Sequence, residues 1–489
     1  MSEIHCQPNL ICADSEEISG MYRFIHSADW QLGARFSQFG ARAEALRHAR
    51  LNTLCRTLSL ARQHAADAVL IAGDLFEDNQ ISDSLVLSVI DVFREFPELP
   101  IYILPGNHDP HTGPDCVWQR KAFLALAPAA LGNVHVIREA GVISLGPDAC
   151  LIASPLHQKR STNDPSLKLV DLAATLPADT IKIGMTHGSL AIESKHKPDD
   201  FPIALNAATR AGLDYLAIGH WHNWLADIDG GRIVMPGTPE PDRFSNDDSG
   251  NVALVEIASS GQLPRVQKLH VATLAWRELE YDFSLAAATP DVVASVPAAV
   301  TPDAAPAAKP DAARATFSAS LATLSPQAAT TILRIVMKGA ASPSTLAETR
   351  VWLETACSPF LASQIVDATT LSLTAAEISD LQSRHPILAQ VLADIDRLET
   401  LATGAAVPLA QPLQPTTPAL AQQPDQTFVS AVAVSPSVPP SLPLPAQPLS
   451  LTEVQNILSA SKIELAQLTP AFFARLRQTL FQNLQEVTR

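Results

Sequence analysis

The chain of 489 residues lacks several features that would place it in familiar classes. It has no run of about twenty apolar residues and no basic start followed by an apolar stretch, so we expect no membrane span, no secretory leader and a cytoplasmic location. Its six cysteines show no CxxC spacing. That scatter argues against a structural zinc site or a dithiol redox motif and favours buried free thiols.

Positive charge is also scarce. The chain has 34 lysines and arginines against 50 aspartates and glutamates, which gives a formal net charge of -16. A protein that binds nucleic acid by coating it with basic side chains is therefore excluded. A nuclease remains open, because a local basic groove, bound divalent metals or a partner chain can each supply the attraction.

Glycine is sparse and proline plentiful, with 20 and 38 residues. Much of the proline lies in two stretches without a helical or strand pattern, which we interpret as linkers. The length favours two or three folding units. We predict an N-terminal tail (1–20), a catalytic domain (21–285), a linker (286–315), a cap domain (316–402), a second linker (403–449) and a helical segment (450–489).

Short apolar segments alternate with longer helical patterns, which is typical of an α/β fold in which helices cover a sheet. The strands that we predict are 23–29, 68–74, 100–104, 150–153, 181–187, 215–220 and 232–235, with 331–337 in the cap domain. The helices that we predict are 41–65, 82–93 and 117–131, with 346–356 and 386–401 in the cap domain.

Polar residues able to bind metals follow the ends of five of these strands, where open sheets place their sites. Carboxylate, amide and imidazole groups suit divalent manganese, magnesium, iron or zinc. One of these motifs alone could be an ordinary turn, but five in register indicate a site. The residues are Asp29, Asp74, Asn107 with His108, His187, and His220 with His222.

Two cations close together need a carboxylate that can bridge them, and Asp74 is the natural candidate. Such a pair activates water for attack on phosphorus and neutralises charge on the phosphoryl oxygens. His108 lies beside a ligand and could donate a proton or hydrogen bond to the leaving oxygen.

The motifs DWQ, GDLFED, GNHD, a single HG and GHWH, in this order, resemble those of the calcineurin-like metallophosphoesterases over roughly residues 22–245. HSADWQLG, YLAIGHWH and PGTPEP resemble its SbcD-type nuclease branch. The resemblance implies a β-sandwich flanked by helices, a small α/β cap domain, a C-terminal helical segment and two divalent metals, with manganese first and magnesium as the alternative. It implies that one metal is held by Asp29, Asp74 and His222, the other by Asp74, Asn107, His187 and His220, and that His108 is catalytic.

Gln31 departs from the family pattern, which has histidine at this position. A glutamine oxygen can bind a hard cation, but less tightly than an imidazole, so we expect a weaker or more manganese-selective first site. The bridge, the second site and His108 do not depend on this residue.

Other polar residues near the motifs have more ordinary interpretations. Arg35 could contact a substrate phosphate or form a surface salt bridge, and His26 is expected to be a packing histidine. Asp78 and Asp109 could orient a ligand or be solvated. We expect His64, His111 and His196 to be ordinary surface residues.

About forty residues follow the second linker, too few for a stable core alone, so their amphipathic helices are expected to dock on a partner. By resemblance, that partner is an SbcC-like, SMC-family coiled-coil ATPase, contacted by Phe472, Phe473 and Leu476. The resemblance also implies DNA as substrate and a homodimer formed through the nuclease domain.

The function that we predict is a metal-dependent DNA exonuclease with some endonuclease activity, acting in end processing, repair or defence. Two alternatives remain open. One is a phosphoesterase for a small diester or a phosphoprotein, and the other is a non-catalytic scaffold in which Gln31 marks decay.

Overall fold

A computed structural model describes residues 21–284, 310–384 and 395, except for 114, 122, 124–131, 194, 196, 246–247 and 373–374. Two compact units divide the chain. Among described residues, the first unit contains 21–281, 314–336 and 352–366, and the second contains the remainder. No helix in these described parts combines the length and the apolar character that a membrane crossing requires.

The first unit is built on two six-stranded sheets. In the first sheet, β1 to β4 run parallel to one another, and β11 and β12 extend it in antiparallel fashion. Its order is β12 (Arg265–His270), β11 (Asn251–Ile257), β1 (Tyr22–Ser27), β2 (Ala68–Ala72), β3 (Ile101–Leu104) and β4 (Val134–Val136).

The second sheet has a parallel centre and antiparallel edges. Its order is β5 (Gly141–Ser144), β6 (Ala149–Ser154), β7 (Ile181–His187), β8 (Tyr215–Gly219), β10 (Ile233–Met235) and β9 (Leu225–Ile228). Parallel strands are normally buried on both faces and are therefore nearly continuous in apolar residues, which is why they were visible in the sequence.

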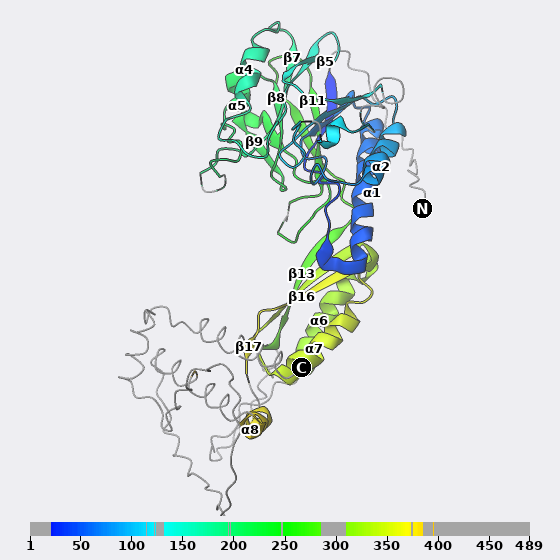
Figure 1. The fold of residues 1–489 in the computed structure, drawn as a ribbon, viewed down its shortest axis with the longest axis vertical. Helices are drawn as coiled ribbons and strands as arrows, with labels where there is room; N and C mark the ends of the chain where they lie inside the picture. Colours follow the sequence, from blue (N-terminus) through cyan, green and yellow to red (C-terminus); the bar gives the residue numbers. More distant parts are fainter. Residues whose placement is uncertain are drawn as a thin grey trace, which may run out of the picture. The chain divides into compact units, whose positions relative to one another are not determined.

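Helices cover the outer face of each sheet (Figure 1). On one side lie α1 (Ala43–Gln63) and α2 (Asp83–Arg94), and on the other α4 (Leu167–Ala173) and α5 (Ala207–Ala211). The start of α2 is fixed by Ser82, whose hydroxyl accepts a hydrogen bond from the backbone of Leu85 at 3.3 Å. The short 3₁₀ segments are Ser37–Arg42, Val117–Gln119 and Asp229–Gly231.

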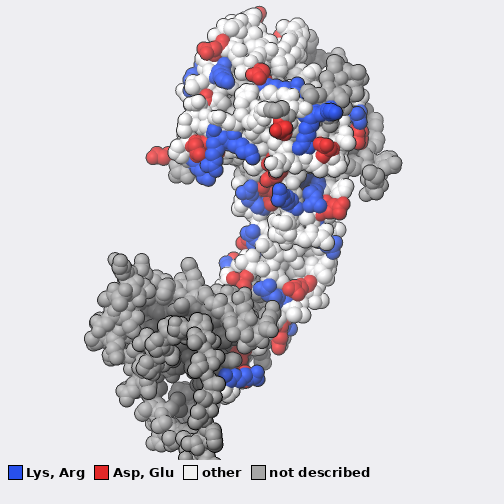
Figure 2. All heavy atoms as spheres, in the orientation of Figure 1, with Lys and Arg blue, Asp and Glu red and all other residues white. Residues whose placement is uncertain are grey.

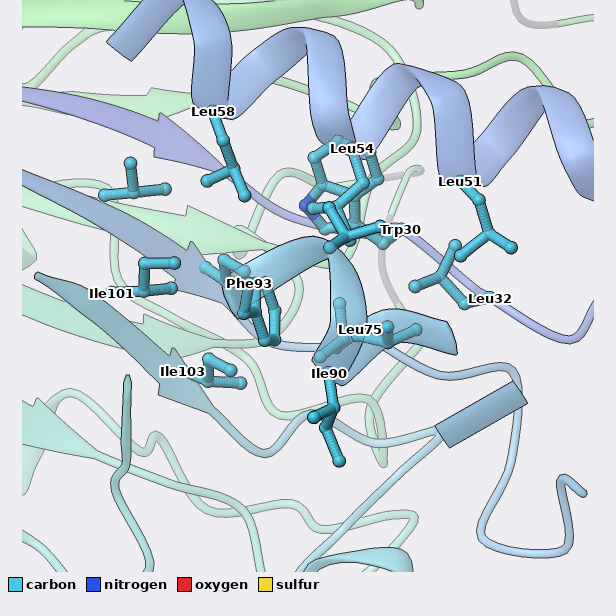
Figure 3. Packing of buried hydrophobic residues seen from close by; sticks show 14 of the residues in the cluster. Trp30, Leu32, Leu51, Leu54, Leu58, Leu75, Ile90, Phe93, Ile101 and Ile103 are labelled. Carbon is cyan, nitrogen blue, oxygen red and sulfur yellow. The ribbon is translucent and has the colours of Figure 1, made fainter. Parts of the chain in front are cut away.

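Three apolar clusters hold these layers together. Side chains alternate across β1, so that Phe24 faces the cluster between the two sheets while Ile25 faces the helices. Figure 3 shows the helix-facing cluster, in which Trp30 lies beneath Leu54 of α1 and close to Phe93 of α2. The third cluster packs α4 and α5 against the second sheet. The first turns after the strands are thus buried on a rigid frame.

A separate three-stranded sheet follows, in the order β13 (Ala275–Asp282), β14 (Thr331–Lys338) and β16 (Ala362–Asp367). Within the first unit, Ile332 and Ala362 of this sheet pack with Phe36 and Phe39 from the segment after β1. The other elements are α6 (Pro310–Leu324), a 3₁₀ segment (Ser325–Thr330), β15 (Ala340–Ala341), α7 (Pro343–Ala356), β17 (Thr370–Leu371) and α8 (Ala375–Arg384).

The α/β class and the helix-flanked sheets are confirmed, but several boundaries differ. The predicted linker 286–315 ends too late, because α6 begins at Pro310. The predicted helix 117–131 is a 3₁₀ turn over Val117–Gln119 where its start is described. Cys116, Cys150 and Cys357 are free as expected, whereas Cys55 is disulfide-bonded, so the expectation of free thiols was wrong there.

The tail 1–20, the second linker 403–449 and the segment 450–489 lie outside the described residues, as does nearly all of the predicted helix 386–401. The partner-binding residues Phe472, Phe473 and Leu476 are therefore still predictions.

Candidate metal centre

The predicted ligands lie at the carboxyl ends of parallel strands from both sheets. Asp29 and Asp74 follow β1 and β2, and Asn107 follows β3, all in the first sheet. His187 ends β7 and His220 follows β8, both in the second sheet. The site is thus assembled between the two sheets, where chain segments distant in sequence meet.

The backbone at the site is unusually strained. Four of the predicted ligands have positive φ angles, namely Asp29 at 56°, Gln31 at 42°, Asp74 at 55° and His220 at 126°. L-residues avoid this region, and such strain is concentrated at functional sites. The sharp turns aim these side chains at a common centre instead of along the strand.

Asp29, Asp74 and His187 form the buried centre of the site. One potential ligand atom from each lies within 4.8 Å of the others, and their exposed fractions are 0%, 1% and 0%. His187 Nδ1 donates a hydrogen bond to the carbonyl of Ala72 at 2.8 Å, so its Nε2 faces Asp74 Oδ2 at 3.3 Å. A backbone acceptor therefore fixes the imidazole with Nε2 towards the ligands.

Asn107 connects this centre to His220. Its Oδ1 lies 2.9 Å from His187 Nε2 and 2.9 Å from His220 Nδ1. The backbone N–H of His220 donates to both carboxylate oxygens of Asp29 at 2.9 Å. Four predicted ligands thus share one hydrogen-bonded cluster with Asp74.

Gln31 and His222 stand together at the other side of Asp29. Gln31 Nε2 lies 3.1 Å from His222 Nε2, so the glutamine does occupy a position beside a predicted ligand. His222 Nδ1 lies 3.2 Å from Asp242 Oδ2, and Asp242 is also paired with Arg243 at 3.0 Å. The structure brings all seven predicted ligands into one region.

The electrostatics match a centre built to hold cations. Burial would lower the pKa of His187, but the charge of Asp74 raises it to about 9. Burial would raise the pKa of Asp74, but His187 holds it below its usual range. Burial raises the pKa of Asp29. Two buried carboxylates that face imidazoles are compensated here by shared protons, a role that divalent cations can take over.

His108 is held beside the centre by two contacts. Its backbone N–H donates to Asp74 Oδ1 at 2.8 Å, and its Nδ1 donates to the carbonyl of Glu77 at 2.9 Å. The second contact leaves Nε2 as the nitrogen that can serve a substrate. This arrangement supports the predicted role of His108 without testing it.

Asp109 and Asp78 are now distinguished. The buried carboxylate of Asp109 accepts hydrogen bonds from the backbone N–H groups of Gly106 at 2.7 Å and Phe76 at 2.9 Å. It ties the loop after β3 to the loop after β2. Asp78 accepts from the backbone of Gln80 in a local turn, so its role is to shape that turn.

Sequence reasoning missed two acidic residues that orient ligands. Asp200 Oδ2 lies 2.9 Å from His220 Nε2, and Asp242 contacts His222 as described above. Each leaves the opposite imidazole nitrogen to face the site, as carboxylate–histidine pairs do at metal centres. Asp200 lies in a loop without a motif, and only the folded loop reveals its partner.

Arg35 is exposed, as a substrate-binding residue would need to be. It lines a pocket of about 410 Å³ that also contains Arg47, His48 and Ser82. Arg47 donates to the backbone carbonyl of Arg35 at 3.1 Å, which supports that segment. His26 is fully buried and is paired with Tyr215 at 2.8 Å, as expected for a packing residue.

The residues present fit two divalent cations. The donor set consists of carboxylate oxygens, an amide oxygen and imidazole nitrogens whose other ring nitrogen is already bonded, which is the chemistry that such ions require. The grouping of Asp29, Asp74 and His187 is tight enough for one ion. Asn107, His220 and His222 surround it with further ligands.

Residues 22–224 match the family of calcineurin-like phosphoesterases. This part of the chain is a calcineurin-like metallophosphoesterase domain, a class that uses a dinuclear metal site.

Among curated proteins, the chain is similar to the DNA double-strand break repair protein Mre11 of Methanopyrus kandleri, with 25% identity over 239 residues, 45% of this chain and 49% of that protein. It is 25% identical to Mre11 of Aeropyrum pernix over 281 residues, 54% of this chain and 64% of that protein. It is 28% identical to the SbcD component of the nuclease SbcCD of Escherichia coli over 286 residues, 51% and 68% of the two chains. The matched region thus spans less than two thirds of either Mre11 protein.

Proposed function

We propose that this chain is a metal-dependent DNA nuclease that hydrolyses phosphodiester bonds, chiefly as an exonuclease and also as an endonuclease. The observation that carries the proposal is the convergence of Asp29, Asp74 and His187 with Asn107 and His220 on one buried centre. The names of the related proteins, a break-repair protein and a nuclease, favour DNA over other phosphoesters.

In this proposal, Asp29, Gln31, Asp74 and His222 hold one divalent ion, and Asp74, Asn107, His187 and His220 hold the other. When bound, the ions supply positive charge for the phosphoryl oxygens and lower the pKa of attacking water. We propose manganese as the ion, because Gln31 offers an oxygen where imidazole would favour softer metals.

His108 acts on the leaving group. Its Nδ1 is committed to the Glu77 carbonyl, so a proton on Nε2 is the one that can pass to the departing oxygen. The bond from its backbone to Asp74 keeps the imidazole in register with the ions. Arg35 binds a phosphate of the DNA from its exposed position.

The charge distribution supports a role for the ions in binding as well as in chemistry. On the face drawn in Figure 2, basic and acidic side chains of the described residues are interspersed, without a continuous basic surface. With a net charge of -16, attraction for DNA must be local. Two divalent cations at the site would supply it where the scissile phosphate lies.

We propose that the chain acts with an SMC-like coiled-coil ATPase, bound by Phe472, Phe473 and Leu476, and that it dimerises through the nuclease domain. Residues 316–402 position the DNA. If the docking assignment holds, a Phe472→Asp/Phe473→Asp variant loses co-elution with the ATPase on size exclusion but keeps manganese-dependent cleavage. Unchanged co-elution would contradict it.

A substrate panel tests the proposed function against its alternatives. The full chain, with manganese, is given linear double-stranded DNA, single-stranded DNA, bis-(p-nitrophenyl) phosphate and a phosphopeptide. We expect hydrolysis of DNA. Hydrolysis of only the small diester or the phosphopeptide would favour another phosphoesterase, and no hydrolysis with the ATPase and ATP added would favour a scaffold.

A further inference from the structure

A second group of potential metal ligands lies outside the centre described above. It consists of His111, Glu139 and His157, whose candidate ligand atoms all lie within 4.8 Å of one another. His111 was expected to be an ordinary surface residue. The two imidazole rings have centroids 5.8 Å apart and are inclined by 60°, so their nitrogens can approach a common point without stacking.

The backbone holds the two histidines in place. The N–H of His111 donates to the carbonyl of Leu156 at 3.0 Å, and the N–H of Leu156 donates to the carbonyl of Pro105 at 3.2 Å. His157 Nδ1 in turn donates to the carbonyl of His111 at 3.3 Å. This bond leaves His157 Nε2 unprotonated in the neutral ring and available to a metal, as a backbone carbonyl does for many metal-bound histidines.

The third and fourth donors are close by. Glu139 Oε2 lies 4.0 Å from His157 Nε2, and the glutamate side chain is 81% exposed, so it can rotate towards an ion. Gln119 Nε2 lies 2.9 Å from His111 Nε2. This amide donates to the ring, so His111 Nε2 also carries a lone pair, and rotation of the amide would present its oxygen instead.

We propose that His111, His157 and Glu139 form a structural site for a first-row divalent cation such as zinc, separate from the catalytic centre. Two imidazoles and a carboxylate are a usual set for zinc. Nitrogen and oxygen ligands around one zinc lie about 3.5 Å apart. The exposed Glu139 and the partly exposed His157 can close the remaining distance.

The position of this site gives it a role. His111 follows β3, Glu139 follows β4 and His157 follows β6, so the three ligands come from strands of both sheets. His111 is also three residues beyond His108. An ion here would join the two sheets and fix the loop that carries the proposed catalytic histidine.

Zinc binding to the full chain tests this site. Metal content is measured by mass spectrometry after dialysis against micromolar zinc, for the wild-type chain, His157→Gln and Glu139→Gln, with His64→Gln as a histidine control outside any cluster. We expect His157→Gln to retain one zinc fewer per chain, Glu139→Gln to bind that zinc at least tenfold more weakly, and His64→Gln to match the wild type.

An Asp74→Asn variant separates this site from the catalytic centre. It should lose zinc at the catalytic centre, keep the zinc at His111 and His157, and lose both when combined with His157→Gln. Equal zinc content and affinity in the wild-type chain and His157→Gln would overturn the proposal, whatever the outcome of the nuclease assay.

Discussion

Two histidines of the metal centre each depend on a carboxylate that no motif contains. Asp200 holds His220 and Asp242 holds His222, at 2.9 and 3.2 Å. Such partners fix the ring orientation and raise the basicity of the ligand nitrogen. The pair at His222 is important because its neighbour Gln31 offers only an amide in place of an imidazole.

Replacing Asp242 by asparagine should therefore weaken one metal site selectively. We expect manganese binding at the ion held by His222 to fall by about 10- to 100-fold, with the other ion little affected. Titration calorimetry on the full chain measures both affinities. Asp199→Asn is the matched control, because Asp199 forms an exposed ion pair with Arg160 away from the predicted ligands. Equal loss in both variants, or none, would contradict this role.

His26 makes the stability of the fold depend on pH. It is completely buried, and burial lowers its pKa to about 3. Among the described residues its Nε2 has no hydrogen-bond partner. The folded chain keeps the ring neutral, whereas the unfolded chain binds a proton below about pH 6.5. Stability from this residue is thus intact above pH 6.5 and lost as the pH falls towards 3.

A His26→Gln variant isolates that contribution, since glutamine can still bond the Tyr215 hydroxyl without titrating. Between about pH 6.5 and 3, the wild type should lose up to about 1.4 kcal/mol per pH unit more than the variant. Urea unfolding at a series of pH values measures the difference. Parallel curves for the two proteins would show that His26 is not the group responsible.

At the scale of elements, the site depends on how closely three loops approach. A Cβ on Gly106, in the loop after β3, would lie 2.1 Å from Asp74 Oδ1 and 2.4 Å from the Asp74 backbone nitrogen. Its φ angle is not positive, so the need for glycine is purely one of space. The GNHD and GDLFED motifs are thus parts of one packed unit.

Gly106→Ala should therefore destabilise the fold by about 1–3 kcal/mol or displace Asp74 and weaken metal binding. Gly141→Ala is the control, because a Cβ there meets nothing within 4 Å and its φ is also not positive. Denaturant unfolding and manganese titration follow the two effects. If Gly106→Ala matched Gly141→Ala in both measurements, the close approach would be wrong.

The central strands and the ligands at their ends could be predicted because each signal is local. β2 is a continuous run of buried residues, and its end is marked by the glycine and aspartate of GDL. β12 could not be found in the same way, since its side chains are largely exposed and it depends on pairing with β11. The partners of Asp200 and Asp242 depend on loop conformation, which no spacing encodes.

At the scale of the molecule, the two sheets contribute different parts of one site. The first sheet supplies the carboxylates and the amide through Asp29, Asp74 and Asn107, and the second supplies imidazoles through His187 and His220. Neither sheet alone contains a complete donor set. Folding of the sandwich and formation of the metal centre should therefore be coupled, so that bound metal stabilises the fold.

The measurement that tests the central claim most directly is degradation of linear DNA by the purified full chain with manganese, compared with Asp74→Ala and His108→Ala. The account predicts cleavage by the wild type that chelation abolishes. It also predicts loss of cleavage and of one or both ions in Asp74→Ala, and loss of cleavage with metal binding retained in His108→Ala. Wild-type rates in either variant, or no cleavage by the wild type even with an SMC-like ATPase and ATP, would contradict it.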